Sequence, residues 1–210
     1  MAFGFTKESY LLNYNRLFAL LWISVIARFS ILLPLVGNKF LPGGIADYFL
    51  SVQLLTCLFD LFNVITKIIE IKNSNLFILN FISKLLISSI LLQYPKIARN
   101  ESFSTLIISW SLQEFFKNLY MIFKIRNKGI YKVPYLIYWF YSNNFILVYP
   151  LRVLSEIAII FLSLRYAQAY KKSLGLIIIL YLFIFVKIYS TMFSRRNSKK
   201  YEYYYHKKHD

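Results

Sequence analysis

The sequence predicts an all-α membrane protein, a polytopic bundle of six transmembrane helices. Of its 210 residues, 58% are hydrophobic, and the mean hydropathy is +0.52. The chain contains several apolar runs of roughly 20 residues, the length that an α-helix needs to cross a bilayer. Because lipid offers the backbone no hydrogen-bonding partners, each run is expected to be helical. A soluble domain of this size would not contain several such runs.

The predicted helices follow one another closely, at 17–36, 48–66, 75–94, 104–123, 134–163 and 173–193. The fifth run contains Pro150, which predicts a tilt or a bend because proline removes a backbone hydrogen bond. The first run lacks a small-residue cleavage site and is too long for a signal peptide. We therefore expect one six-helix membrane domain over residues 1–194 and a basic, disordered tail over residues 195–210.

The basic residues predict the orientation of the bundle. A net charge of +16 would suggest nucleic-acid binding in a soluble protein. In a membrane protein, Lys and Arg instead accumulate in cytosolic loops. If the N-terminus is cytosolic, the loops on that side hold more than twice as many Lys and Arg as the opposite loops. Both termini are therefore predicted to be cytosolic.

The last four residues, Lys207-Lys208-His209-Asp210, have the dilysine pattern that retrieves membrane proteins to the endoplasmic reticulum. A cytosolic C-terminus is where such a signal would act. We expect a multi-pass protein of the endoplasmic reticulum membrane, with another endomembrane as the alternative.

The composition excludes several kinds of chemistry. Cys57 is the single cysteine, which rules out an internal disulfide and a cysteine-based metal cluster. The two histidines, His206 and His209, lie in the tail, where neither can serve a buried metal site or a Ser-His-Asp triad. We expect no metal and no cofactor.

The most informative feature is the pair Tyr149 and Glu156 within the apolar stretch FILVYPLRVLSEIAII. Ionisable groups at membrane depth are costly and mark function by default. Seven residues make almost two helical turns, so both side chains are expected on one helix face, about 10 Å apart along the axis. Burial makes a carboxylate easier to protonate, which suits proton exchange near neutral pH.

Five basic residues lie within the apolar runs: Arg28, Lys84, Lys117, Arg152 and Lys187. With few buried acids beside them, they predict a polar cavity or an anionic ligand. Lys117 follows Glu114 by three residues, and Arg152 precedes Glu156 by four. Both spacings predict ion pairs within one helix. Such a pair would favour the ionised form of Glu156 and work against proton exchange.

Short motifs along the chain resemble the 3-hydroxyacyl-CoA dehydratases of very-long-chain fatty acid elongation, also called protein tyrosine phosphatase-like proteins. The opening stretch YLLNYNRLFALLW matches in Tyr10-Leu11, Tyr14-Asn15 and Trp22. The fourth run matches a WSxxE motif in Trp110-Ser111 and Glu114, and the fifth matches in Trp139, Tyr149-Pro150 and Glu156. The resemblance implies that Tyr149 and Glu156 are the catalytic pair.

The chain departs from the family pattern at several positions. Thr56 and Phe59 stand where the family has Glu and His, and a Ser-Arg pair becomes Ser83-Lys84. The Arg-Tyr after WSxxE becomes Lys117-Asn118, the Arg-Tyr-Thr run becomes Tyr141-Ser142-Asn143, and a glycine becomes Arg152. A cysteine-based phosphatase loop needs arginine six residues after its cysteine, and Cys57 is followed there by Asn63. The sequence excludes that chemistry.

The resemblance implies dehydration of 3-hydroxyacyl-CoA to trans-2-enoyl-CoA, with Glu156 as base and Tyr149 as acid and hydrogen-bond donor. Arg152 either neutralises Glu156 or stabilises the thioester oxygen, and Glu114 with Lys117 either supports the site or forms a simple pair. The loop residues Lys124, Arg126, Lys128 and Lys132 either meet the CoA phosphates or are ordinary cytosolic charge. Other membrane enzymes of the elongation cycle are expected partners. The alternative is a catalytically inactive member acting as a membrane scaffold or translocation component.

Overall fold

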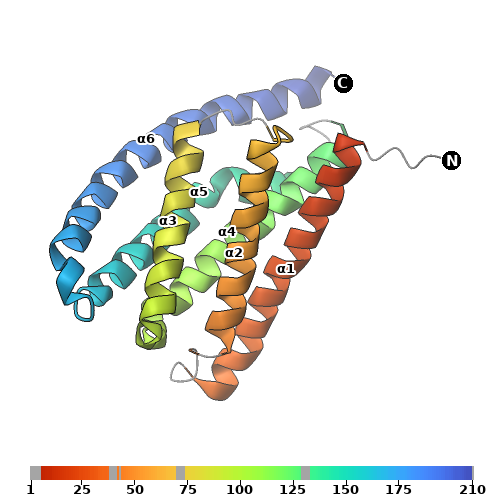
Figure 1. Cartoon of the computed structure of the whole chain (residues 1–210). Coiled ribbons are helices and arrows are strands. Elements are labelled where there is room, and N and C mark those ends of the chain that lie inside the picture. The colour runs from red at the N-terminus through yellow and green to blue at the C-terminus, as the bar shows by residue number, and fades with distance from the viewer. Residues whose placement is uncertain (1–5, 38–41, 43, 70–73, 129–132, 210) are drawn as a thin grey trace.

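The computed structural model describes residues 6–37, 42, 44–69, 74–128 and 133–209, which form a bundle of long helices (Figure 1). In chain order the helices are α1 (Lys7–Val36), α2 (Ile45–Ile65), α3 (Ser74–Gln93), α4 (Glu101–Arg126), α5 (Tyr135–Ser163) and α6 (Lys171–His209). Short 3₁₀ turns, η2 (Pro95–Arg99) and η3 (Gln168–Tyr170), precede α4 and α6. The described residues contain no strand, and the predicted six-helix bundle is confirmed.

Four of the helices, α1, α2, α5 and α6, are long and apolar enough to cross a membrane. The described apolar part of α3, Phe77–Gln93, is shorter. Helix α4 is more polar because it lies inside the bundle, where it packs mainly against α1 and α5. Its buried residues include Ser109, Ser111 and Glu114. Ser109 Oγ donates to the Leu106 carbonyl of the same helix, and Glu114 pairs with Lys84 of α3.

The start of α1 and the end of α6 lie at the same end of the bundle (Figure 1). The expected disordered tail is wrong, because α6 continues as a helix to His209. Extending an existing helix is far easier than starting one, and residues 195–209 contain no Gly or Pro to end it. The side chains of Lys207 and Lys208 lie outside the described part, so the retrieval signal stays a prediction.

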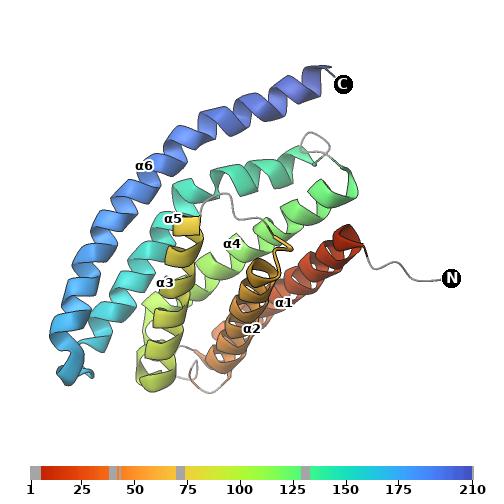
Figure 2. The ribbon, with the colours of Figure 1, turned by 45° about the horizontal axis from the view of Figure 1, so that its top comes forward.

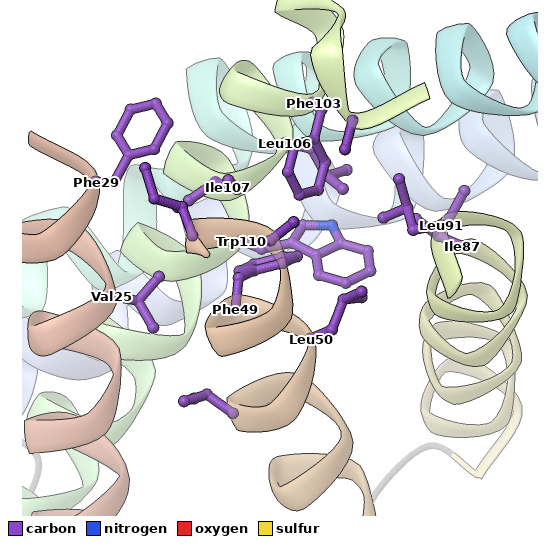
Figure 3. Packing of buried hydrophobic residues seen from close by; sticks show 14 of the residues in the cluster. Val25, Phe29, Phe49, Leu50, Ile87, Leu91, Phe103, Leu106, Ile107 and Trp110 are labelled. Carbon is purple, nitrogen blue, oxygen red and sulfur yellow. The ribbon is translucent and has the colours of Figure 1, made fainter. Parts of the chain in front are cut away.

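The apolar core lies between α1, α2 and α4. Phe49 of α2 packs on Trp110 and Phe103 of α4, with ring centroids 5.7 Å and 5.8 Å apart. Figure 3 shows these rings between Val25 of α1 and Ile87 of α3. The side chain of Trp110 is 1% exposed. This core fixes the position of α4, from which the polar residues of the site extend.

Helices α5 and α6 form the outer side of the bundle. Figure 2 shows α5 bent along its length, and Pro150 lies inside this helix, as the sequence predicted. Helix α6 runs along the outside, and none of its described side chains is buried. Its contacts are chiefly with α5. The space between α3, α5 and α6 is where the candidate site lies.

Candidate functional site

Glu156, on α5, is 1% exposed and accepts four hydrogen bonds. Its Oε1 accepts from Trp110 Nε1 on α4 at 2.8 Å and from Arg152 Nε at 2.6 Å. Its Oε2 accepts from Ser83 Oγ on α3 at 3.0 Å and from the Tyr181 hydroxyl on α6. A carboxylate has about four lone-pair positions. All four positions are used, and the Glu156 side chain joins α3, α4, α5 and α6.

Arg152 completes this polar centre. In addition to Glu156, its Nη1 donates to Gln113 Oε1 at 3.1 Å and its Nη2 donates to Asn80 Oδ1 at 2.5 Å. Its guanidinium carbon lies 5.4 Å from the ring centroid of Trp110. The predicted ion pair with Glu156 is therefore confirmed.

A cavity of about 670 Å³ opens beside this centre, between α3, α5 and α6 with α4 behind. Along α6 its lining extends from Ile177 to Met192, about 22 Å at the rise of an α-helix. Eleven of its 20 lining side chains are aliphatic, Phe or Met. The polar ones are Asn80, Ser83, Gln113, Lys117, Tyr141, Tyr149, Arg152, Glu156 and Tyr181. The cavity thus has a long apolar wall with a polar region in it.

Tyr149 and Glu156 line this same cavity, so the predicted common helix face is confirmed. The Tyr149 ring stacks on Phe185 of α6, with centroids 5.8 Å apart and an interplanar angle of 20°. Among the described residues, no hydrogen bond joins Tyr149 to Glu156. The two groups therefore share a space without touching each other.

A second polar cluster lies between α1, α2, α3 and α4. Glu114 accepts from Lys84 at 2.5 Å and from Lys117 at 2.8 Å, and the latter is the predicted pair within α4. Lys117 also lies 3.6 Å from Asp60, which accepts from the Tyr14 hydroxyl at 2.6 Å. Two carboxylates thus face two ammonium groups. Since Lys117 also lines the cavity, the cluster extends to the edge of the site.

The cations within the helices do not require an anionic ligand. Lys84, Lys117 and Arg152 are matched by Glu114, Asp60 and Glu156. The remaining two sit elsewhere: Arg28 lies over the ring of Tyr48 at 5.0 Å, and Lys187 is exposed. Asp60, on α2, is partly buried. The polar cavity, the other predicted explanation, is present.

The loop cations lie away from the cavity. Lys124 and Arg126 are in the last turn of α4, and Lys128 follows with a positive φ of 51°. None of the three lines the cavity, and Lys124 lies about 10 Å beyond Lys117 along the helix. Lys132 lies outside the described residues. Contact of these residues with CoA phosphates stays a prediction.

Sequence reasoning missed Ser83, Asn80, Gln113 and Tyr181 as members of the site. Tyr181 carried a signal, because it is a phenol in the middle of the aliphatic run LIIILYLFIFV. A buried phenol usually finds a hydrogen-bond partner. The amide side chains of Asn80 and Gln113 gave no comparable signal, since such groups commonly form hydrogen bonds between membrane helices.

Comparison with known families decides the relationship. The family model described as protein tyrosine phosphatase-like protein, PTPLA, matches residues 53–202, which include α3, α4, α5 and α6 as far as residue 202. The chain belongs to this family. It is a divergent member of what is also the very-long-chain 3-hydroxyacyl-CoA dehydratase family.

One curated relative of the chain is the beta-1,6-glucan synthesis-associated protein KEG1 of Saccharomyces cerevisiae. It is 27% identical over 158 residues, which cover 72% of this chain and 76% of the relative. No solved structure matches the chain.

The residues of the PTPLA motifs form contacts between the helices of the bundle. Trp110 of the WSxxE motif donates to Glu156, and Glu114 of the same motif holds two lysines one turn further along α4. Lys84 and Lys117 stand where the pattern has arginine, and both keep the positive charge that Glu114 faces. These departures therefore preserve the charge balance of the second cluster.

The phosphatase part of the family name does not describe this chain. Cys57 is buried inside α2, where its sulfur accepts a hydrogen bond from Gln53 Nε2 at 3.1 Å. The residue six positions later is Asn63, on the same helix. A cysteine in a continuous helix has no loop of backbone N–H groups around it to bind a phosphate.

Proposed function

We propose that this chain dehydrates 3-hydroxyacyl-CoA to trans-2-enoyl-CoA in the very-long-chain fatty acid elongation cycle. One observation carries the proposal: a buried carboxylate lies in the wall of a long apolar cavity, beside phenols and a guanidinium. Membership of the PTPLA family supports the same reaction. Acid–base chemistry of this kind needs no cofactor.

The reaction removes a proton from C2 and expels the hydroxyl group from C3 as water. Glu156 takes the C2 proton, and Tyr149 donates a hydrogen bond to the departing 3-hydroxyl and gives it the proton that makes it water. The electrons released at C2 develop negative charge on the thioester oxygen. Arg152 has five N–H donors and uses three of them on protein groups, so two remain for that oxygen.

The cavity suits a long acyl chain. Its length of about 22 Å along α6 and its aliphatic lining match an extended hydrocarbon. The CoA phosphates would stay at the cytosolic end, where Lys124, Arg126, Lys128 and Lys132 supply positive charge. Lys117, at the cavity edge, lies between that end and the polar centre.

The second candidate is an inactive member that serves as a membrane scaffold or translocation component. Two observations favour it. Arg152 occupies Glu156 in a buried ion pair, and KEG1, a relative of this chain, is named for an association with β-1,6-glucan synthesis. A scaffold would need the bundle but no proton exchange at Glu156.

Turnover by the purified protein tests the proposal. We expect 3-hydroxyacyl-CoA to be converted to trans-2-enoyl-CoA, measured by mass spectrometry with a matched saturated acyl-CoA as the control substrate. The saturated compound should be unchanged, because it has no hydroxyl group to expel. A folded protein that converts neither compound would sink the dehydratase proposal and leave the scaffold.

We also propose that the protein resides in the endoplasmic reticulum membrane with both termini in the cytosol, where it meets other membrane enzymes of the cycle. The start of α1 and the end of α6 lie at the same end of the bundle, which supports such a topology (Figure 1).

Replacing Lys207 and Lys208 with Ser is expected to release the protein to later compartments, because the dilysine pattern would be lost. Microscopy of the tagged protein measures this. The control replaces Lys199 and Lys200 with Ser, which removes the same charge upstream of the pattern. Equal localisation of both variants and the wild type would show that the dilysine match is accidental.

A further inference from the structure

Tyr181 lies in the first third of α6, the helix on the outside of the bundle. Its hydroxyl donates to Glu156 Oε2 and lies within hydrogen-bonding distance of Ser83 Oγ, whose own hydrogen also goes to Oε2. Tyr181 lines the cavity, as Glu156 does. A phenol is therefore in direct contact with the proposed base and at the same time borders the space where the substrate would lie.

We propose that Tyr181 is the acid of the reaction, so that the proton-exchanging pair of this chain is Glu156 with Tyr181. The inference rests on the proposed dehydratase function and changes one role within it. Tyr149 then donates a hydrogen bond to the 3-hydroxyl without giving up its proton.

The proton balance favours this pair. Glu156 takes a proton from C2, and the C–H electrons pass toward the thioester oxygen. The C3–O bond then breaks, C2 and C3 form the double bond, and the departing hydroxide takes the Tyr181 proton to become water. The neutral Glu156 carboxyl finally returns its proton to the Tyr181 phenolate. The site is then ready for another cycle.

Direct return of the proton is available to Tyr181 and not to Tyr149. Tyr181 and Glu156 are already hydrogen-bonded, so the last transfer follows an existing contact. Tyr149 has no hydrogen bond to Glu156 within the described residues, and its ring is held against Phe185. Its phenolate would need a separate proton carrier.

The same contact explains how a fully occupied carboxylate becomes a base. Trp110 and Arg152 hold Oε1, whereas Oε2 is held by the two hydroxyl groups. Hydroxyl hydrogens rotate to suit their partners. When the Tyr181 hydroxyl turns to the substrate 3-hydroxyl, it frees Oε2 to accept the C2 proton. One rotation of the Tyr181 hydroxyl therefore brings the acid to the substrate and exposes the base.

The arrangement also predicts the stereochemistry. Because the acid and base lie within one hydrogen bond of each other, both would act on the same side of the C2–C3 bond. We expect syn elimination from substrate carrying deuterium stereospecifically at C2.

The test uses Tyr181→Phe in the full-length protein. We expect dehydration to fall by about 100-fold or more, since the acid is lost. Incubation in D₂O should nevertheless place deuterium at C2 of the recovered 3-hydroxyacyl-CoA, because Glu156 still removes and returns that proton. Tyr149→Phe should lose less dehydration activity than Tyr181→Phe. Recovered substrate is analysed by mass spectrometry.

Tyr48→Phe is the matched control. It removes a tyrosine–serine hydrogen bond of 2.6 Å, between Tyr48 and Ser24, that joins α1 to α2 away from the cavity. We expect wild-type turnover from it. A merely structural role for Tyr181 would make dehydration and C2 exchange fall together, and that result overturns the acid role.

The possible failures are distinguishable. An active wild type with an equally active Tyr181→Phe overturns the role of Tyr181 alone, as does a greater loss in Tyr149→Phe. A folded but inert wild type overturns the dehydratase function and, with it, the role of Tyr181.

Discussion

Glu156→Gln is expected to reduce turnover of 3-hydroxyacyl-CoA by about 100-fold or more, because the amide cannot accept the C2 proton. The same change should lower the free energy of unfolding by about 3–5 kcal/mol. Arg152 is 3% exposed, and its guanidinium would remain buried without a counter-charge. Activity and stability in detergent both need to be measured, since either change alone would lower the observed rate.

A second variant separates the two effects. Glu156→Gln combined with Arg152→Gln removes both charges, so most of the lost stability should return. Turnover should stay as low as in Glu156→Gln alone, because the base is still missing. Recovery of activity in the double variant would show that Glu156 acts only as the partner of Arg152, and the proposed chemistry would fail.

The fold was predictable because the bilayer leaves few choices. Each apolar run had to become a helix, and all six predicted runs lie within α1 to α6 apart from residues 66, 94 and 134 at their ends. Hydropathy indicates which segments are apolar enough to lie in lipid. It does not indicate whether the polar residues after the last span are helical or disordered. The disorder expected after residue 194 was wrong for this reason: α6 passes that residue without interruption.

The site was predictable only where its contacts are local. The pairs Glu114–Lys117 and Arg152–Glu156 follow from spacings of three and four residues on one helix. The contacts of Glu156 with Ser83 and Tyr181 span 73 and 25 positions. They depend on how α3 and α6 pack against α5, which periodicity within one helix does not determine.

Trp110 shows how the packing and the chemistry are connected. Its ring contacts Phe49 in the core, its indole N–H donates to Glu156, and its π face lies near the guanidinium of Arg152. The core therefore fixes the orientation of the polar centre. One turn further along α4, Glu114 holds the second cluster, so a single helix positions both sets of buried charges.

Lys84→Met is expected to lower the free energy of unfolding by about 3–5 kcal/mol. The side chains of Lys84 and Glu114 are 4% and 3% exposed, and their atoms lie 2.5 Å apart. Without Lys84, Lys117 alone would face both Glu114 and Asp60, which leaves one buried negative charge in excess. Methionine has a similar length and shape, so the loss would come from the charge rather than from a void.

Two further variants test whether the lost charge causes the loss of stability in Lys84→Met. Lys117→Met should cost less than half as much, because the Lys117 side chain is 40% exposed and Glu114 keeps Lys84 as its partner. Lys84→Met combined with Glu114→Gln should be more stable than Lys84→Met alone, since Lys117 and Asp60 then remain as a balanced pair. If the double variant is less stable by the sum of the two single losses, Lys84 and Glu114 do not interact, and the cluster stabilises the bundle by packing rather than by charge.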